Sequence, residues 1–322
     1  MPALYGVRVS LNEASAKALA PWLDGSPGLA SGPVVPIEVL EGAQVAPTVL
    51  ERFIVERAGW LGRSESALVV GNDDGAWFVI DSAPVRVSGV LGRAERGDAT
   101  RDLLLGALLV ALRSLGVYAI HSAAVSFDDQ ALLLLGDSGA GKSTTATALV
   151  TAGCKYLGDD ALLLRRNGGD VELLPLWSTF RLTEQSLAAF SSLRAHGQKV
   201  AEEEKWRLDV QLAFPNRFLS HWLGHKTVLF LRRSGAAHSV LRAVSKAEAV
   251  GLLIAQSSAL GLACHPNPRE HLDLLAQLAA VANVAQLELG TEWLSDPSGA
   301  GHRLLEQTRA LWHARELRSE AS

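Results

Sequence analysis

The spacing of apolar and polar residues divides the chain into two regions of different character. Before residue 97 it favours short strands, such as Tyr5 to Val9, Trp77 to Ile80 and Val85 to Val90, between proline-containing loops. From residue 98 onward, runs with helical spacing alternate with buried strands. We therefore expect a β-rich N-terminal accessory region over residues 1–97 and a mixed α/β (α+β) domain over residues 98–322.

The second region is predicted to begin with a helix and to continue as a mixed sheet. Apolar spacing predicts a helix from Asp98 to Leu115 that Gly116 ends. Two short strands before the buried run at Leu132 indicate a hairpin-bearing sheet rather than a simple doubly wound one. The further predicted elements are strands at 118–121, 123–127, 156–164, 171–174, 179–182, 227–231 and 284–289, and helices at 186–195, 246–256, 269–284 and 301–317.

The run from Leu132 to Thr145 contains the most specific chemical pattern in the chain. It reads L-L-L-L-G-D-S-G-A-G-K-S-T-T, the layout of a phosphate-binding P-loop between a strand and a helix. Its glycines permit the backbone to turn N–H groups toward phosphate oxygens. Lys142 is expected to reach the β- and γ-phosphates of ATP, and Ser143 to bind Mg²⁺. The predicted nucleotide-binding residues are Gly136, Asp137, Ser138, Gly139, Ala140, Gly141, Lys142, Ser143 and Thr144.

Two adjacent carboxylates, Asp159 and Asp160, follow the P-loop helix. From there they can return to the mouth of the loop beside Lys142. One carboxylate can bind Mg²⁺ together with Ser143, while the other accepts the proton of an attacking hydroxyl. The alternative is a polar turn, since Gly-Asp-Asp is a common turn sequence. The apolar residues on both sides favour the functional interpretation.

Composition and charge exclude several classes of function. A net charge of -4 over 322 residues gives no general attraction to nucleic acid or to an anionic membrane. Cys154 and Cys264 lie far apart without a CxxC partner, so we expect buried thiols rather than a zinc site or a disulfide framework. No secretion signal or bilayer-spanning run is present. The protein is expected to be soluble and cytoplasmic, and its oligomeric state, a homo-oligomer included, stays open.

Three motifs together resemble the bacterial HPr kinase/phosphorylase family. They are I-H-S-A-A-V from Ile120, the P-loop, and L-G-D-D from Leu157, so the resemblance covers roughly His121 to Leu164. The family includes shorter relatives encoded beside lasso-peptide and other modified-peptide clusters. The resemblance implies a P-loop core in a mixed sheet, of the kind shared with ATP-dependent phosphoenolpyruvate carboxykinases.

The resemblance also implies roles for individual residues. Asp159 would be the base that activates a serine hydroxyl, Asp160 would join Ser143 on Mg²⁺, and His121 would lie near the reacting phosphate. A half-buried histidine at a strand end is the alternative for His121. The expected activity is an ATP-dependent kinase whose partner is a peptide or protein with a serine hydroxyl, such as a modified-peptide precursor. The chain lacks the family's glycine-rich C-terminal signature, so HPr itself is not the expected substrate.

Other interpretations of the same motifs stay open. A small-molecule kinase would use the same residues on another hydroxyl, and a nucleotide-binding switch or transport ATPase would transfer no phosphoryl group to an acceptor. Against the transport type, no L-S-G-G-Q-like signature is present and Arg232-Arg233 follows the strand at 227–231. Arg181, Lys205 and Arg207 are candidate cations for the phosphoryl group or, alternatively, solvated surface residues. The charged segment 198–207 is expected to be a mobile loop or an exposed helix face.

Overall fold

A computed structural model describes residues 3–4, 7–17, 34–40, 44–56, 59–92, 98–199, 205–257 and 267–319. The chain is mixed α/β with several mixed sheets, in agreement with the predicted fold class. It divides into two compact units. Unit 1 comprises residues 1–119, 163–166 and 257–273, and unit 2 comprises residues 120–162, 167–256 and 274–322. The boundary at residue 97 between an accessory region and a kinase domain stays a prediction.

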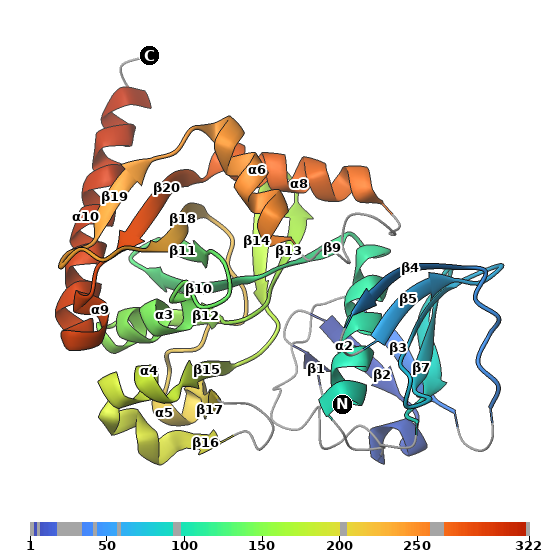
Figure 1. Ribbon diagram of the computed structural model, residues 1–322. Helices are drawn as coiled ribbons and strands as arrows, with labels where there is room; N and C mark the ends of the chain where they lie inside the picture. The colour runs from blue at the N-terminus through green and yellow to red at the C-terminus, as the bar shows by residue number, and fades with distance from the viewer. Residues whose placement is uncertain are drawn as a thin grey trace. The chain divides into compact units, whose positions relative to one another are not determined.

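Unit 1 contains an eight-stranded sheet and helix α2 (Asp98–Arg113) (Figure 1). The strand order is β1-β2-β3-β8-β7-β6-β5-β4. Leu104, Leu108 and Leu112 recur every four residues along α2 and are buried, as expected of a helix that packs on a sheet. The helix ends two residues earlier than predicted, and Gly116 beyond it has a φ of 71°. The strands are β1 (Ala3–Leu4), β2 (Val7–Leu11), β3 (Val34–Val39), β4 (Glu51–Glu56), β5 (Gly59–Arg63), β6 (Leu68–Gly71), β7 (Trp77–Ser82) and β8 (Val85–Val90).

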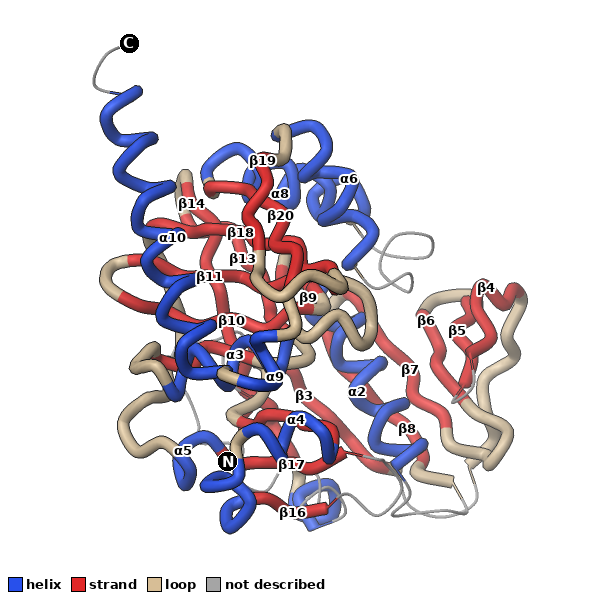
Figure 2. Tube along the Cα trace, turned by 60° about the vertical axis from the view of Figure 1, so that its left-hand side comes forward, coloured by secondary structure: helices blue, strands red, loops and turns tan. Residues whose placement is uncertain are grey.

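Unit 2 is built on a six-stranded mixed sheet in the order β12-β10-β11-β18-β20-β19. Strands β11, β18 and β20 are parallel, whereas β10 and β19 run antiparallel to their neighbours. Helices α3 and α6 lie on opposite sides of this sheet (Figures 1 and 2). The strands are β10 (Ser122–Phe127), β11 (Gln130–Leu135), β12 (Lys155–Gly158), β18 (His225–Arg233), β19 (Val240–Ala243) and β20 (Asn283–Leu289).

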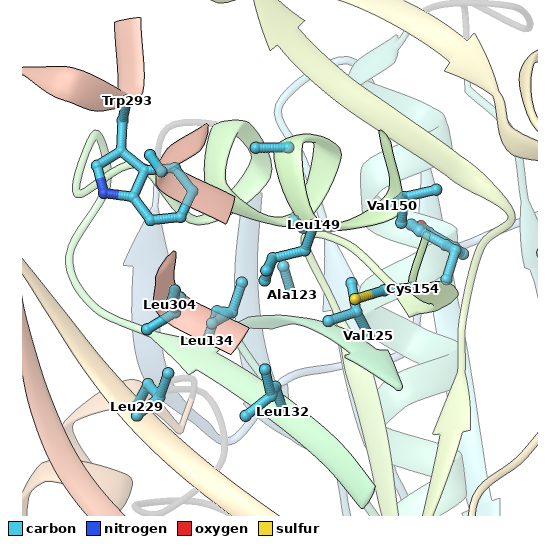
Figure 3. Packing of buried hydrophobic residues seen from close by; sticks show 14 of the residues in the cluster. Ala123, Val125, Leu132, Leu134, Leu149, Val150, Cys154, Leu229, Trp293 and Leu304 are labelled. Carbon is cyan, nitrogen blue, oxygen red and sulfur yellow. The ribbon is translucent and has the colours of Figure 1, made fainter. Parts of the chain in front are cut away.

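The hydrophobic core of unit 2 lies between one face of this sheet and helices α3 and α10 (Figure 3). Leu132 and Leu134 of β11 and Leu229 of β18 face the core, where they meet Leu149 of α3. On the opposite face of β11, Leu133 is fully buried as well. A strand covered on both sides needs apolar residues at every position, which explains the uninterrupted run of leucines before the P-loop.

A second, three-stranded sheet in unit 2 has the order β15-β17-β16. Strands β16 and β17 contain every described residue of segment 198–207, so the prediction of a loop or helix was wrong for these residues; residues 200–204 lie outside the described residues. This sheet consists of β15 (Thr179–Thr183), β16 (Gly197–Lys199) and β17 (Lys205–Asp209). The other strands of this part of the chain are β9 (Val117–Ile120), β13 (Leu162–Asn167) and β14 (Asp170–Pro175).

The helices agree with the sequence patterns more closely than the strands do. The prediction for 246–256 is confirmed, and the helix predicted at 186–195 is an α-helix followed by a short 3₁₀ helix. The continuous strand predicted at 156–164 was wrong, because the chain turns at Asp160, whose φ is 70°. The helices are α3 (Lys142–Thr151), α4 (Glu184–Ala189), η1 (Ser191–His196), α5 (Val210–Ala213), α6 (Lys246–Gln256), α8 (Pro268–Val281), α9 (Glu292–Ser295) and α10 (Pro297–Ser319).

One of the two cysteines lies in the described part of the chain. Cys154 is a buried free thiol, as predicted, and burial raises its pKa to about 12. Cys264 lies outside the described residues. Within the described ranges, no helix has both the length and the apolar character needed to cross a bilayer.

Replacing Leu229 by alanine should destabilise unit 2, because this side chain is 0% exposed in the middle of the sheet. The expected loss is about 2–5 kcal/mol of unfolding free energy, the usual effect of a cavity in a packed core. Urea unfolding followed by circular dichroism measures it. The control is Leu212→Ala on α5, whose side chain is 69% exposed and should change the value by less than about 0.5 kcal/mol. Equal losses in both variants would contradict the assignment of the core.

Candidate functional site

Strand directions bring the predicted site residues to one edge of the six-stranded sheet. Strands β11 and β12 are both antiparallel to β10, so they run parallel to each other. Ser122 at the start of β10 pairs with Leu135 at the end of β11, and Ala124 pairs with Gly158 at the end of β12. The P-loop, the Asp159-Asp160 pair and His121 therefore meet at this edge. The carboxyl ends of parallel strands are the usual location of ligand sites in α/β proteins.

The P-loop has the backbone conformation that its glycines predict. Gly136, Gly139 and Gly141 have φ angles of 148°, 80° and 105°. A side chain at position 136 would lie 2.6 Å from the carbonyl oxygen of Leu231, so glycine is required for the close approach of β18. Helix α3 begins at Lys142 and has no acidic residue in its first turn. The positive end of the helix dipole and the turned N–H groups together favour an anion here.

The ammonium group of Lys142 lies against the P-loop. Its Nζ donates hydrogen bonds to the carbonyl oxygens of Gly136 and Asp137, at 2.6 and 3.1 Å. The residue is 6% exposed, and burial lowers its pKa, while Asp159, Asp160 and Asp137 act in the opposite direction. The cation is therefore held at the loop by backbone dipoles, close to three carboxylates.

Asp159 is a buried carboxylate with two hydrogen bonds to different elements. Its Oδ1 accepts a hydrogen bond from the hydroxyl of Ser143 at 2.9 Å, and its Oδ2 accepts one from the backbone N–H of Arg181 at 3.1 Å. The residue is 1% exposed, and burial raises the pKa of its carboxyl to about 6 although both hydrogen bonds lower it. A carboxylate with this pKa can exchange a proton near neutral pH, as a general base must.

Asp160 and His121 form a second, more exposed part of the site. The carboxylate of Asp160 lies 3.3 Å from Nη1 of Arg181, and its side chain is 37% exposed. The Nδ1 of His121 lies 2.8 Å from the carbonyl oxygen of Asp160. Because a carbonyl only accepts, Nδ1 must carry the proton, and the neutral ring then has its lone pair on Nε2. Burial, followed by the charge of Lys142, lowers the pKa of His121, which favours this neutral form.

The structure adds contacts around the site that sequence analysis missed. The hydroxyl of Thr144 lies 2.7 Å from that of Ser186, which is also hydrogen-bonded to Thr183, the N-cap of α4. Thr144 thus has its hydroxyl in contact with α4. Gln256 contacts the side chain of Asp137 at 3.4 Å and the backbone of His121. The capping pattern of Thr183 is visible in the sequence, but its contact with the P-loop helix is not.

The residues at this edge fit a magnesium-bound nucleoside triphosphate. The P-loop supplies N–H groups and a lysine for phosphates, and Ser143 with the two aspartates supplies the oxygen ligands that Mg²⁺ prefers. Among the described residues, no group of three or more His, Cys, Asp or Glu side chains is placed to hold a metal alone.

Comparison with known proteins gives distant similarity to solved structures. No protein-family model matches the chain, and no curated protein matches it. Among solved structures, the chain is similar to the Hpr(Ser) kinase/phosphatase from Coxiella burnetii, with a TM-score of 0.30 and 11% sequence identity. The alignment covers 63% of this chain and 98% of that one. A likeness at this level does not assign the chain to a family, and the function of the site must be inferred from its own residues.

The pKa of Asp159 predicts how stability depends on pH. Since the native carboxyl titrates at about 6 and an unfolded one at about 3.8, the folded protein keeps the proton between these values. The contribution of Asp159 to stability is therefore greatest at low pH and is lost as pH rises through about 6. Relative to Asp159→Asn, the wild-type protein should lose on the order of 3 kcal/mol between about pH 4 and pH 7. Urea unfolding of both proteins across this range measures the difference, and a difference that does not change with pH would contradict the burial of a titrating Asp159.

Proposed function

We propose that this protein is an ATP-dependent kinase that transfers the γ-phosphoryl group to a serine-type hydroxyl of a peptide or protein. The observation that supports this most directly is the buried Asp159, hydrogen-bonded to Ser143 of the P-loop helix and with a pKa of about 6. An aspartate beside the P-loop serine can also serve as a Mg²⁺ ligand in a protein that only binds a nucleotide, so the feature that favours a base is the pKa of about 6. The base and the phosphate loop therefore support transfer to a hydroxyl.

The proposed reaction is a single in-line transfer. The acceptor oxygen attacks the γ-phosphorus, its proton passes to the carboxylate of Asp159, and the bond between the γ-phosphorus and the β,γ-bridging oxygen breaks to release ADP. Lys142 and the P-loop N–H groups stabilise the negative charge on the phosphate oxygens. His121 presents a lone pair on Nε2 that can orient the acceptor hydroxyl. Ser143 and Asp160 would hold Mg²⁺, which would supply positive charge to offset that of the nucleotide phosphates.

The reverse assignment of the two aspartates is a second candidate, and one contact favours it. The hydroxyl of Ser143 is hydrogen-bonded to Asp159 and not to Asp160, so Asp159 lies next to the proposed metal position. In this alternative Asp159 binds Mg²⁺, and the more exposed Asp160, near His121, receives the proton. Both assignments use the same residues and differ in which carboxylate is the base.

Removing the base should abolish phosphoryl transfer without preventing nucleotide binding. With γ-labelled ATP, Mg²⁺ and a serine-containing peptide, we expect Asp159→Asn to reduce transfer by roughly 10²–10⁴-fold. Asparagine has the same shape; its oxygen can accept from the Arg181 N–H while its NH2 group donates to the Ser143 hydroxyl, so ATP affinity should be nearly unchanged. Lys142→Ala should reduce both transfer and ATP affinity. The measurement is label on the peptide, together with ADP formed only when peptide is present.

The control for this assay is Asp129→Asn. Asp129 is exposed in the turn between β10 and β11, at the opposite edge of the same sheet. The change removes the same charge away from the site and should leave transfer unaffected. ATP hydrolysis without an acceptor that is equally fast in wild type and Asp159→Asn would contradict the kinase and favour a nucleotide-binding switch or ATPase.

The two assignments of the aspartates predict different magnesium dependences. If Asp160 binds the metal, Asp160→Asn should raise the Mg²⁺ concentration needed for half-maximal ATP binding, whereas Asp159→Asn should not. The reverse assignment predicts the opposite. Isothermal titration with ATP at a series of Mg²⁺ concentrations distinguishes them, because this readout does not depend on turnover.

A further inference from the structure

The three-stranded sheet β15-β17-β16 of unit 2 has buried apolar side chains on one face and a cluster of basic side chains on the other. Phe180 pairs with Leu208 across β15 and β17, and both side chains are fully buried. Because side chains alternate along a strand, the residues next to Phe180 on β15 and next to Leu208 on β17 point to the other side of the sheet. There Arg181 pairs directly with Arg207, and Lys205 lies two residues before Arg207 on β17. We call Arg181, Lys205 and Arg207 the basic face.

The basic face places like charges together at a cost in stability. Two arginines directly opposite each other on neighbouring strands repel and destabilise the pair. The charge of Arg181 is offset by Asp160 at 3.3 Å. Arg207 is exposed, and its described polar contact is the neutral side chain of Gln198 at 3.4 Å; among the residues that the structure describes, it has no carboxylate partner. The net charge of the chain is -4, so this concentration of positive charge does not reflect a generally basic surface.

The basic face begins at the proposed transfer site. The backbone N–H of Arg181 is hydrogen-bonded to Asp159, and its guanidinium group is paired with Asp160. Lys205 is near enough to Lys142 and His121 for its charge to lower the pKa of both groups. An acceptor whose hydroxyl reaches Asp159 would therefore have its neighbouring groups beside these cations.

We propose that the basic face binds acidic side chains adjacent to the acceptor serine, so that the substrate is an acidic peptide segment. This inference rests on the proposed kinase function and adds the class of acceptor. Positions two residues apart on a strand are separated by about 7 Å, which is also the distance between alternate residues of an extended peptide. Lys205 and Arg207 can therefore contact two acidic residues of an extended peptide. Arg207 provides the planar fork that binds a carboxylate with two hydrogen bonds.

The other anion that the basic face could bind is the nucleotide itself. Lys205 is close to the P-loop lysine, and phosphates attract the same cations. Arg207 lies on β17, next to the strand β15 that contacts Asp159. Its replacement therefore distinguishes binding of the acceptor from binding of the nucleotide. If the face serves the acceptor, replacing Arg207 should alter peptide binding and leave nucleotide binding intact.

The experiment measures peptide binding without phosphoryl transfer. The probe is a fluorescein-labelled peptide in which aspartates alternate with glycines around one alanine, the alanine replacing the acceptor serine. Its counterpart has asparagine at every aspartate. Fluorescence anisotropy at constant ionic strength, with Mg²⁺ and ADP present, gives the Kd for both. We expect the wild-type protein to bind the aspartate peptide more tightly, and Arg207→Gln and Lys205→Gln each to weaken that binding by roughly fivefold. The Kd for ADP should be unchanged in Arg207→Gln.

Matched controls come from the other face of the same sheet. Lys199 pairs with Trp206, and the guanidinium of Arg194 lies 4.9 Å from the centre of the Trp206 ring, so both belong to the face opposite Lys205 and Arg207. Lys199→Gln and Arg194→Gln remove the same charges and should leave peptide binding unchanged. Equal losses in these controls, equal affinity for the two peptides, or a weakened Kd for ADP in Arg207→Gln would each overturn the proposal.

The outcomes for the acceptor class and for the kinase function are distinguishable. If the aspartate peptide binds through Arg207 but its serine form receives no label, the basic face is confirmed and the kinase fails. If serine peptides receive label regardless of their aspartates, the kinase is supported and the basic face as an acceptor site is overturned.

Discussion

The buried carboxylate of Asp159 holds the candidate site together. Its two oxygens accept hydrogen bonds from Ser143 at the start of the P-loop helix and from the backbone of Arg181 on β15. Tyr156, three residues earlier, prepares this arrangement, since its hydroxyl donates to the carbonyl oxygen of Thr179 and its ring packs edge-on against Phe180. A buried charge needs such partners, because an unpaired carboxylate in the interior is strongly destabilising. The same burial that disfavours the charged form of Asp159 also raises its pKa into the range of a base.

Local patterns along the chain predict much of the secondary structure of unit 2. The leucine run before Gly136, the glycines of the loop and the lysine-serine pair specify strand, loop and helix, because each depends on backbone conformation or burial at that position. The helix at 246–256 is predicted for the same reason, because its apolar spacing is a local signal. The proximity of Asp159 to Ser143 can also be predicted from the sequence, since a strand that follows a P-loop helix returns to the same edge of the sheet.

Features that depend on partners distant in sequence could not be predicted. Asp160 breaks a run of apolar residues that has the pattern of one strand, and its positive φ allows its carbonyl to meet His121, 39 residues earlier. The charged segment before Asp209 has the composition of a solvated loop or helix, yet Trp206 and Leu208 pair with Leu182 and Phe180 of β15. Contacts between residues that are far apart in sequence decide both cases, and single-sequence periodicity contains no information about which residues or strands will be neighbours.

The hydroxyl contact between Thr144 and Ser186 connects α3 with α4, which directly follows β15. A displacement of the first turn of α3 would therefore be transmitted to the strand that bears Arg181. Free-energy coupling between two ligand positions is reciprocal, so a nucleotide that strengthens acceptor binding is itself bound more tightly when the acceptor is present, by the same factor. In such a protein the order in which the ligands arrive does not alter the stability of the ternary complex. The described contacts that could carry such coupling from α3 to β15 are the hydroxyl pair of Thr144 and Ser186 and the hydrogen bonds of Asp159.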